Sequence, residues 1–132
     1  MQQQEYEAVK AKLYDMTPSL VAEILAIFEA DYDLVNRFGN KLPNIAEQEV
    51  KRLRDVLLGA LLLDHPPLLH REIEWLVRVA SVRNFNLQTV RKHLSHWRYR
   101  LNLDLPARYK ATVLALYDQA TAQVNGLPLF VE

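Results

Sequence analysis

The stretch LHREIEWLVR, residues 69–78, decides the fold that this sequence predicts. It follows the double proline Pro66-Pro67, which makes a rigid turn because each proline fixes its own φ angle. The apolar members recur at the three- and four-residue spacing of one helix face: Leu69, Ile73, Leu76 and Val77. The charged members lie beside them: Arg71, Glu72, Glu74 and Arg78. The stretch therefore predicts a helix over about residues 67–83 with one buried side and one charged side.

The same helical periodicity continues in both directions along the chain. Only three glycines and six prolines interrupt it, and no stretch alternates convincingly with the two-residue period of a strand. We expect six helices, the first over about residues 3–14. The starts of four others are marked by Thr17-Pro18, by a capping box of Asn44 and Glu47, by Asn86 and by Asp104-Leu105-Pro106. With 132 residues, the sequence predicts one all-α domain over residues 1–132 around a single hydrophobic core.

Composition and charge predict a soluble, cytoplasmic protein. The chain has no cysteine for a disulfide or a thiolate nucleophile. Its start, residues 1–5, is polar and acidic, unlike a secretory signal. The longest apolar run, residues 56–63, is far too short to span a bilayer. We therefore expect no membrane partner.

The charges balance overall but are unevenly distributed. Sixteen basic and sixteen acidic residues cancel, yet residues 1–50 hold nine acidic and four basic residues. Residues 51–132 hold the remaining seven acidic and twelve basic residues. Such polarity can steer an anionic ligand to one face or pair two subunits head to tail. We expect a homodimer on this basis.

Three of the four histidines are candidate metal ligands. His65 precedes Pro66 and is expected in a turn, whereas His93 and His96 are three residues apart on one helix and share a face. That spacing is compatible with joint metal ligation, but a zinc site needs further ligands and no cysteine exists to supply them. Haem needs only one axial histidine, and His70, His93 and His96 are the candidates. The alternative is that His93 and His96 are ordinary residues of a basic helix.

The sequence offers no catalytic constellation, and we expect a protein that is not an enzyme. Glu72 and Glu74 are two residues apart and point in different directions on a helix, so they cannot form an acid–base pair by themselves. Glu74 is instead placed to pair with Arg71 or Arg78. No serine lies in a nucleophile elbow, and neither a phosphate-binding glycine loop nor a HExxH pattern occurs.

Residues 71–110 form a basic segment that suggests nucleic-acid binding as a third possibility. They hold nine basic and three acidic residues, with Trp75, Phe85, Trp97 and Tyr99 between them. Basic residues would neutralise phosphates and aromatic rings would stack on bases. The aromatic residues fall largely on helix stripes, however, and the connection at residues 83–86 lacks the glycine of a helix-turn-helix. The same basic residues would suit the propionates of a tetrapyrrole equally well.

Helix order and the stretch 69–78 together resemble the globin-like fold, and more specifically the phycobiliprotein subunits. In that family the chromophore-bearing helix begins with Cys-Leu-Arg-Asp, followed by a Glu two residues after the Asp and by an Arg four residues further on. Here Arg71, Glu72, Glu74 and Arg78 match that pattern in charge and spacing. The resemblance extends over about residues 20–120, but only these ten residues are specific.

The resemblance implies a tetrapyrrole ligand, haem or a bilin. Arg71 would hold a propionate and Glu72 would stand where an Asp binds the pyrrole nitrogens. Leu69 replaces the cysteine that forms the thioether bond, so any bilin would be held non-covalently. His70 could ligate haem iron. With Trp75 and Arg78 these residues form the expected cofactor site, as in a small relative associated with bilin biosynthesis, and a tetrapyrrole-metabolism or signalling protein would be its partner.

The sequence leaves two readings of this fold open. The leading one is non-covalent tetrapyrrole binding between the third, fourth and fifth expected helices, to carry or sense the ligand. The alternative is a ligand-free dimerisation or signalling module, in which the apolar tail at residues 127–131 contacts a partner or the chain's own core.

Overall fold

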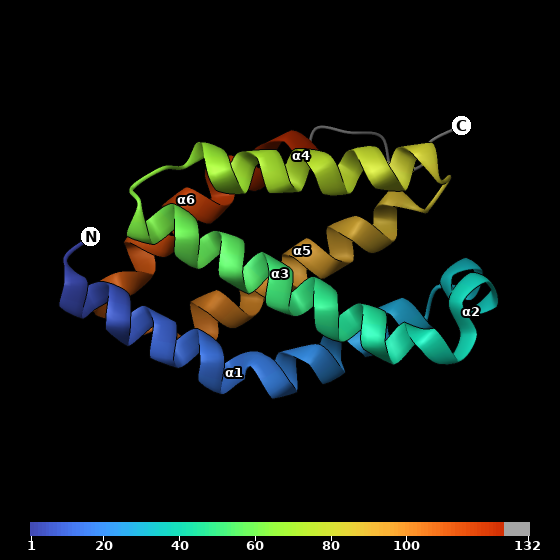
Figure 1. Ribbon diagram of the computed structural model, residues 1–132, viewed down its shortest axis with the longest axis horizontal. Helices are drawn as coiled ribbons and strands as arrows, with labels where there is room; N and C mark the ends of the chain where they lie inside the picture. Colours follow the sequence, from blue (N-terminus) through green and yellow to red (C-terminus); the bar gives the residue numbers. More distant parts are fainter. Residues whose placement is uncertain (126–132) are drawn as a thin grey trace.

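The computed structural model describes residues 1–125, which contain helices and no strand (Figure 1). Five helices are long, and a short helix and one turn of 3-10 helix lie between the first two of them. In chain order they are α1 (Gln3–Glu29), α2 (Tyr32–Phe38), η1 (Gly39–Lys41), α3 (Leu42–Leu62), α4 (Pro67–Val82), α5 (Leu87–Asp104) and α6 (Ala107–Asn125). The all-α prediction is confirmed for these residues. The apolar tail at residues 127–131 lies outside them.

The five long helices close into a ring around one core. α1 packs on α3, α3 on α4, α4 on α6, α6 on α5, and α5 returns to α1, with α4 also touching α5. Figure 1 shows α3 crossing between α1 and α4 in front, with α5 and α6 behind them. The short α2 lies at one end, where it contacts α1 and α3.

The first long helix corrects the sequence prediction, which ended one helix before Thr17-Pro18 and began another there. α1 continues without a break from Gln3 to Glu29. Pro18 has no N–H to donate within the helix, so the Tyr14 carbonyl oxygen loses its usual i+4 donor. The buried stripe keeps its phase across Pro18: Tyr6, Val9, Leu13, Met16, Leu20, Ile24 and Phe28. Burial of seven large side chains outweighs the cost of one interior proline, about 3 kcal/mol.

Two further helix starts differ from the prediction and one is confirmed. α3 begins at Leu42 with Pro43 in its first turn, so Asn44 lies inside the helix and does not cap it. The buried Leu42 anchors this earlier start. Asp104 is the last residue of α5 rather than the start of α6, and its carboxylate accepts from Arg100, one turn earlier, at 2.7 Å. The cap at Asn86 is confirmed, since its side-chain oxygen accepts from the Gln88 N–H at 2.8 Å.

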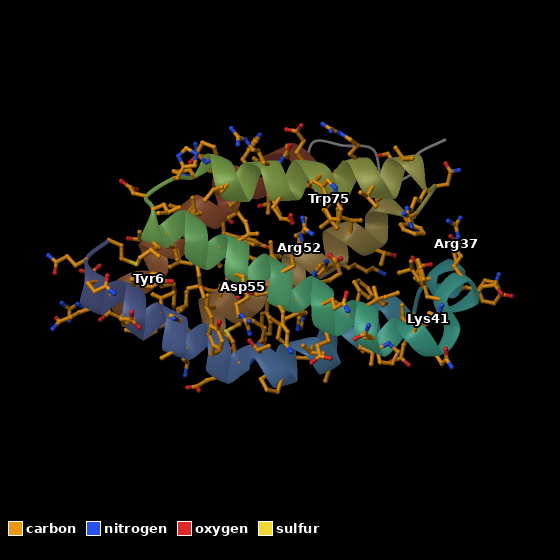
Figure 2. All side chains as sticks on the ribbon, in the orientation of Figure 1. Tyr6, Arg37, Lys41, Arg52, Asp55 and Trp75 are labelled. Atoms are coloured by element: carbon orange, nitrogen blue, oxygen red, sulfur yellow. The ribbon has the colours of Figure 1, made fainter. Side chains whose placement is uncertain are left out.

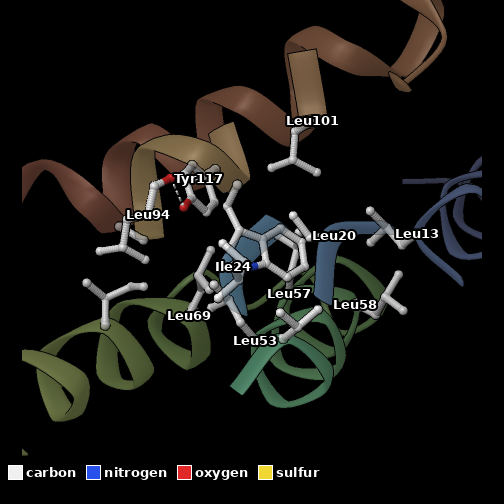
Figure 3. Close-up of a cluster of buried hydrophobic side chains, with 14 of the residues drawn as sticks. Leu13, Leu20, Ile24, Leu53, Leu57, Leu58, Leu69, Leu94, Leu101 and Tyr117 are labelled. Carbon is white, nitrogen blue, oxygen red and sulfur yellow. Dashed lines mark hydrogen bonds between the residues drawn. The ribbon is translucent and has the colours of Figure 1, made fainter. Parts of the chain in front are cut away.

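The core lies inside the ring and is almost wholly apolar. Figure 3 shows leucines from α1, α3, α4 and α5 meeting there with Ile24 of α1, and Tyr117 from α6 at one side. The Tyr117 hydroxyl donates to the Leu94 carbonyl oxygen at 2.6 Å, which satisfies the one polar atom of that ring. Trp97 is fully buried among these residues, whereas Trp75 is 40% exposed. Only Trp75 is therefore placed to meet a ligand.

The helices of residues 1–125 include none whose length and apolar character would let it cross a bilayer.

Candidate ligand-binding site

A cavity of about 300 Å³ lies toward the α2 end of the ring. We call it the His93 cavity. Its walls come from the last turns of α1, from α2, and from parts of α3, α4 and α5. Four aromatic side chains line it: Phe28, Phe38, Trp75 and Phe85. Six polar residues share the lining: Asp31, Glu49, Arg83, Asn86, Thr89 and His93. A mostly apolar cavity with a few polar groups is the usual form of a small-molecule site.

The wall formed by α2 is held in place by specific bonds. The Asp31 carboxylate caps α2 by accepting from the N–H groups of Asp33 and Leu34, and it also accepts from the Thr89 hydroxyl of α5 at 2.6 Å. Arg37 donates to the Arg83 carbonyl oxygen at 2.7 Å. Both oxygens of Asp31 are thus occupied, and the cavity is a built part of the fold.

His93 is the most unusual group in the lining. It is only 2% exposed, and its Nε2 atom has no hydrogen-bond partner among the described residues. Its ring packs nearly perpendicular to that of Phe28, with the ring centroids 5.5 Å apart. Burial and, to a smaller extent, the charge of His96 lower the pKa of His93 to about 4. The imidazole is therefore neutral at physiological pH. An orphaned buried nitrogen is costly unless something else satisfies it.

Next to His93 is a small polar niche of about 10 Å³, which Glu49, Arg52, Glu72 and His93 line together with two leucines. Arg52 donates to both oxygens of Glu72, at 2.9 and 2.6 Å, and its guanidinium lies 4.4 Å from the centre of the Trp75 ring. Figure 2 shows Arg52 and Trp75 close together between α3 and α4. Within residues 1–125, Glu49 forms neither an ion pair nor a side-chain hydrogen bond. Burial raises the pKa of Glu49, the charge of Glu72 raises it further, and Arg52 only partly opposes them.

The structure does not bring together the five residues that the sequence grouped as a cofactor site. Trp75 lines the His93 cavity, and Glu72 borders the niche with its carboxylate bound to Arg52. Arg78 is exposed and pairs with Glu74 at 2.8 Å, one of the two pairs that the sequence predicted. His70 and Arg71 are exposed beside a separate hollow that α6 borders. The stretch 69–78 thus contributes two wall residues to the cavity, Trp75 and Leu76, rather than the whole site.

The three candidate histidines also have separate surroundings. His70 is exposed on α4, and His96 contacts the Glu23 carboxylate of α1. His93 alone lines the cavity. Among residues 1–125, no three histidine or carboxylate side chains are grouped closely enough to hold a metal ion.

A second polar cluster joins α1 to α5, and each of its charged groups has a bonding partner. We call it the α1–α5 charge network; its members are Ser19, Glu23, His96, Arg100 and Asp104. Glu23 accepts from His96 and, through both oxygens, from Arg100 at 2.8 and 2.7 Å. Arg100 also bonds Asp104 at 2.7 Å and the Ser19 hydroxyl at 3.1 Å. Burial alone would raise the pKa of Glu23, but the hydrogen bonds from His96 and Arg100 lower it overall. This network has a structural role and leaves no group for a ligand.

Sequence reasoning missed Glu49, although a signal was present. The α3 positions Leu42, Ala46 and Leu53 are buried, and Glu49 falls in the same three- and four-residue series. A carboxylate on an apolar stripe is uncommon and marks either a paired charge or a site. His93 interrupts the α5 stripe in the same way, three residues after Val90 and four before Trp97.

Comparison of the chain with known protein families, with curated proteins and with solved structures finds no match.

Proposed function

We propose that this protein binds a small, largely apolar molecule non-covalently in the His93 cavity. One observation carries the proposal: an aromatic-lined cavity of about 300 Å³ contains a buried histidine whose Nε2 atom has no partner. Its volume lies at the lower end of the roughly 300–1,000 Å³ that ligand sites enclose. A ligand of one or two rings suits this size. The Nε1 atom of the buried Trp97 also has no partner within residues 1–125 but does not line this cavity, so the combination of the nitrogen with an apolar cavity is what favours a ligand over a ligand-free module.

A substitution that fills the cavity tests this proposal. Val79 lines the cavity and is half-buried, whereas Val82 lies three residues further along α4 and is 77% exposed. In calorimetric titrations with 2-naphthalenemethanol, a neutral two-ring probe, Val79→Trp should weaken binding at least about tenfold because the indole occupies the space. Val82→Trp should bind as the unmodified protein does. Equal affinities for both variants would contradict the proposal.

Haem is a second candidate, which the same histidine favours. The Nε2 atom of His93 is an imidazole nitrogen without a partner, the kind of group that ligates haem iron. A bilin has less support, because Arg71, which the resemblance assigns to its propionate, does not line the cavity. Haem is also larger than a one- or two-ring ligand, and Arg83 is the only arginine of the lining. The globin-like fold and the resemblance to phycobiliprotein subunits remain predictions.

A visible spectrum separates haem from smaller ligands. Haem ligation by His93 predicts that added haemin gives a sharpened, shifted Soret band, that His93→Ala removes it, and that His70→Ala and His96→Ala keep it. If the spectrum of haemin does not change with the protein present, haem is excluded and the proposal of a smaller ligand stands. If His93→Ala keeps the band, another residue ligates the iron.

A further inference from the structure

We propose that the His93 cavity selects a ligand with a protonated amine on an apolar ring body, the ammonium group lying in the niche against Glu49 and His93. This inference rests on the proposed function and names the class of ligand that the site takes. It follows from the charge of the niche, from the partnerless nitrogen and from the shape of the walls.

The niche carries an excess of one negative charge. Glu49 and Glu72 supply two carboxylates, and Arg52 is the one arginine or lysine of this lining. Arg52 is already committed, because its Nε atom donates to both oxygens of Glu72. His93 cannot compensate, since it is neutral at physiological pH. A half-buried carboxylate without a partner is stabilised either by a proton or by a cation that arrives with the ligand.

The two partnerless groups have complementary needs that one ammonium group can meet. An ammonium has three N–H donors and no acceptor. The Glu49 carboxylate accepts hydrogen bonds, and the Nε2 atom of a neutral imidazole accepts one when the proton is on the other ring nitrogen. One ammonium bound to Glu49 in the niche would also lie against His93, which lines the same niche. A carboxylate ligand would instead place a third negative charge beside Glu49 and Glu72.

The other charged groups of the cavity do not change this preference. Both oxygens of Asp31 already accept hydrogen bonds. Arg83 also lines the cavity, but it directly follows the end of α4 and comes seven residues after Leu76, which borders the niche. Seven residues of helix span about 10 Å, so Arg83 lies toward the other end of the cavity. The aromatic walls between these ends suit a flat ring and favour a cation near them.

Three probes of matched shape test the proposal by calorimetric titration: 2-naphthylmethylamine as the cation, 2-naphthalenemethanol as the neutral form and 2-naphthoate as the anion. We expect the amine to bind about tenfold more tightly than the alcohol, because a charge-assisted hydrogen bond replaces a neutral one. The carboxylate should bind most weakly. In Glu49→Gln the preference for the amine over the alcohol should fall to about twofold or less, because the charge is lost while the shape is kept.

Glu47→Gln is the matched control. Glu47 is on the same helix, is exposed, and pairs with Lys51 at 2.9 Å. This variant should keep the full preference for the amine, and circular dichroism should show both variants folded. If the amine and the alcohol bind the unmodified protein equally, or if Glu49→Gln keeps the preference, the amine proposal is overturned while the proposed function stands. If none of the probes binds, both are overturned.

Discussion

The α1–α5 charge network and the polar niche use the same helix in opposite ways. On one side of α5, His96 and Arg100 meet Glu23 of α1, and every group in the network has a partner. Toward the cavity, His93 lies near Glu49 of α3, and neither of these two has a bonding partner within residues 1–125. When charged groups pair inside the chain, removing one partner destabilises the fold, because the other charge is then left without compensation. Groups that the fold buries and leaves without partners weaken it, and under the proposed function a bound ligand would offset that cost at His93 and Glu49.

The largest effect expected from this difference is on the pH dependence of stability. The pKa of His93 is about 4 in the folded protein and about 6.5 when the chain is unfolded. The unfolded state therefore binds the proton more readily, so stability is full above about pH 6.5 and falls as the pH drops toward 4. At about pH 5 the loss should be about 2 kcal/mol relative to about pH 8.

Urea unfolding of the unmodified protein and of His93→Leu at both pH values measures this loss. The raised pKa of Glu49 acts in the opposite direction, because a carboxyl that holds its proton in the folded state stabilises that state as the pH falls. Both proteins contain Glu49, so its contribution cancels when the pH-dependent loss of His93→Leu is subtracted from that of the unmodified protein. The remaining loss in the free energy of unfolding is due to His93. Parallel pH profiles for the two proteins would show that His93 is not the group responsible.

A substitution in the charge network should cost somewhat less. Glu23→Gln removes the charge that Arg100 and His96 face, while Arg100 keeps Asp104. Arg100 is 9% exposed, but the Glu23 side chain is 37% exposed, so water screens part of the interaction. We expect a loss of about 1–2 kcal/mol, below the roughly 3–5 kcal/mol for breaking a fully buried pair.

Glu74→Gln is the control for this substitution, because it breaks the exposed pair with Arg78. It should cost about 0.5 kcal/mol or less. Chemical denaturation at neutral pH compares the two variants. A loss for Glu23→Gln no greater than that for Glu74→Gln would show that the network contributes nothing beyond an ordinary surface pair.

The smallest effect should have the opposite sign. His93→Leu replaces a buried ring that has an unsatisfied nitrogen by an apolar side chain, and it should raise the free energy of unfolding at about pH 8 by about 1 kcal/mol. Binding of the naphthylamine probe should fall in the same variant. Greater stability with weaker binding would be the signature of a site kept at a cost to the fold. A destabilised variant would show that His93 is a structural residue.

The helices could largely be predicted from the sequence, because helix formation depends on local spacing. The stripe of α4 and the cap at Asn86 are both readable from neighbouring residues. The break expected at Pro18 was wrong for a tertiary reason: α3 and α5 pack along α1 and bury its stripe on both sides of the proline. A sequence pattern shows that Pro18 lacks an N–H. It does not show that burial of the α1 side chains outweighs the free-energy cost of that proline.

The candidate site could be predicted only in part. Trp75 was expected to meet a ligand and lines the cavity, and His93 was one of three histidines that the sequence could not rank. His70, Arg71 and Arg78 share the stretch with Trp75 but lie on exposed sides of α4. A ten-residue helical segment turns through almost three turns, so one continuous stretch cannot direct all its side chains to one pocket.

By itself, the sequence determined the all-α class, the spacing of the apolar stripes and the exclusion of a thioether-bound chromophore at Leu69. These properties depend on residue type and on near neighbours along the chain. Only the tertiary structure decided that Glu23 would meet Arg100 and that Glu49 would lie beside His93. Each pair joins two helices, so the contact depends on how the five long helices pack against one another. No local sequence pattern specifies that packing. Packing therefore set which charged groups are paired and which are left without a partner.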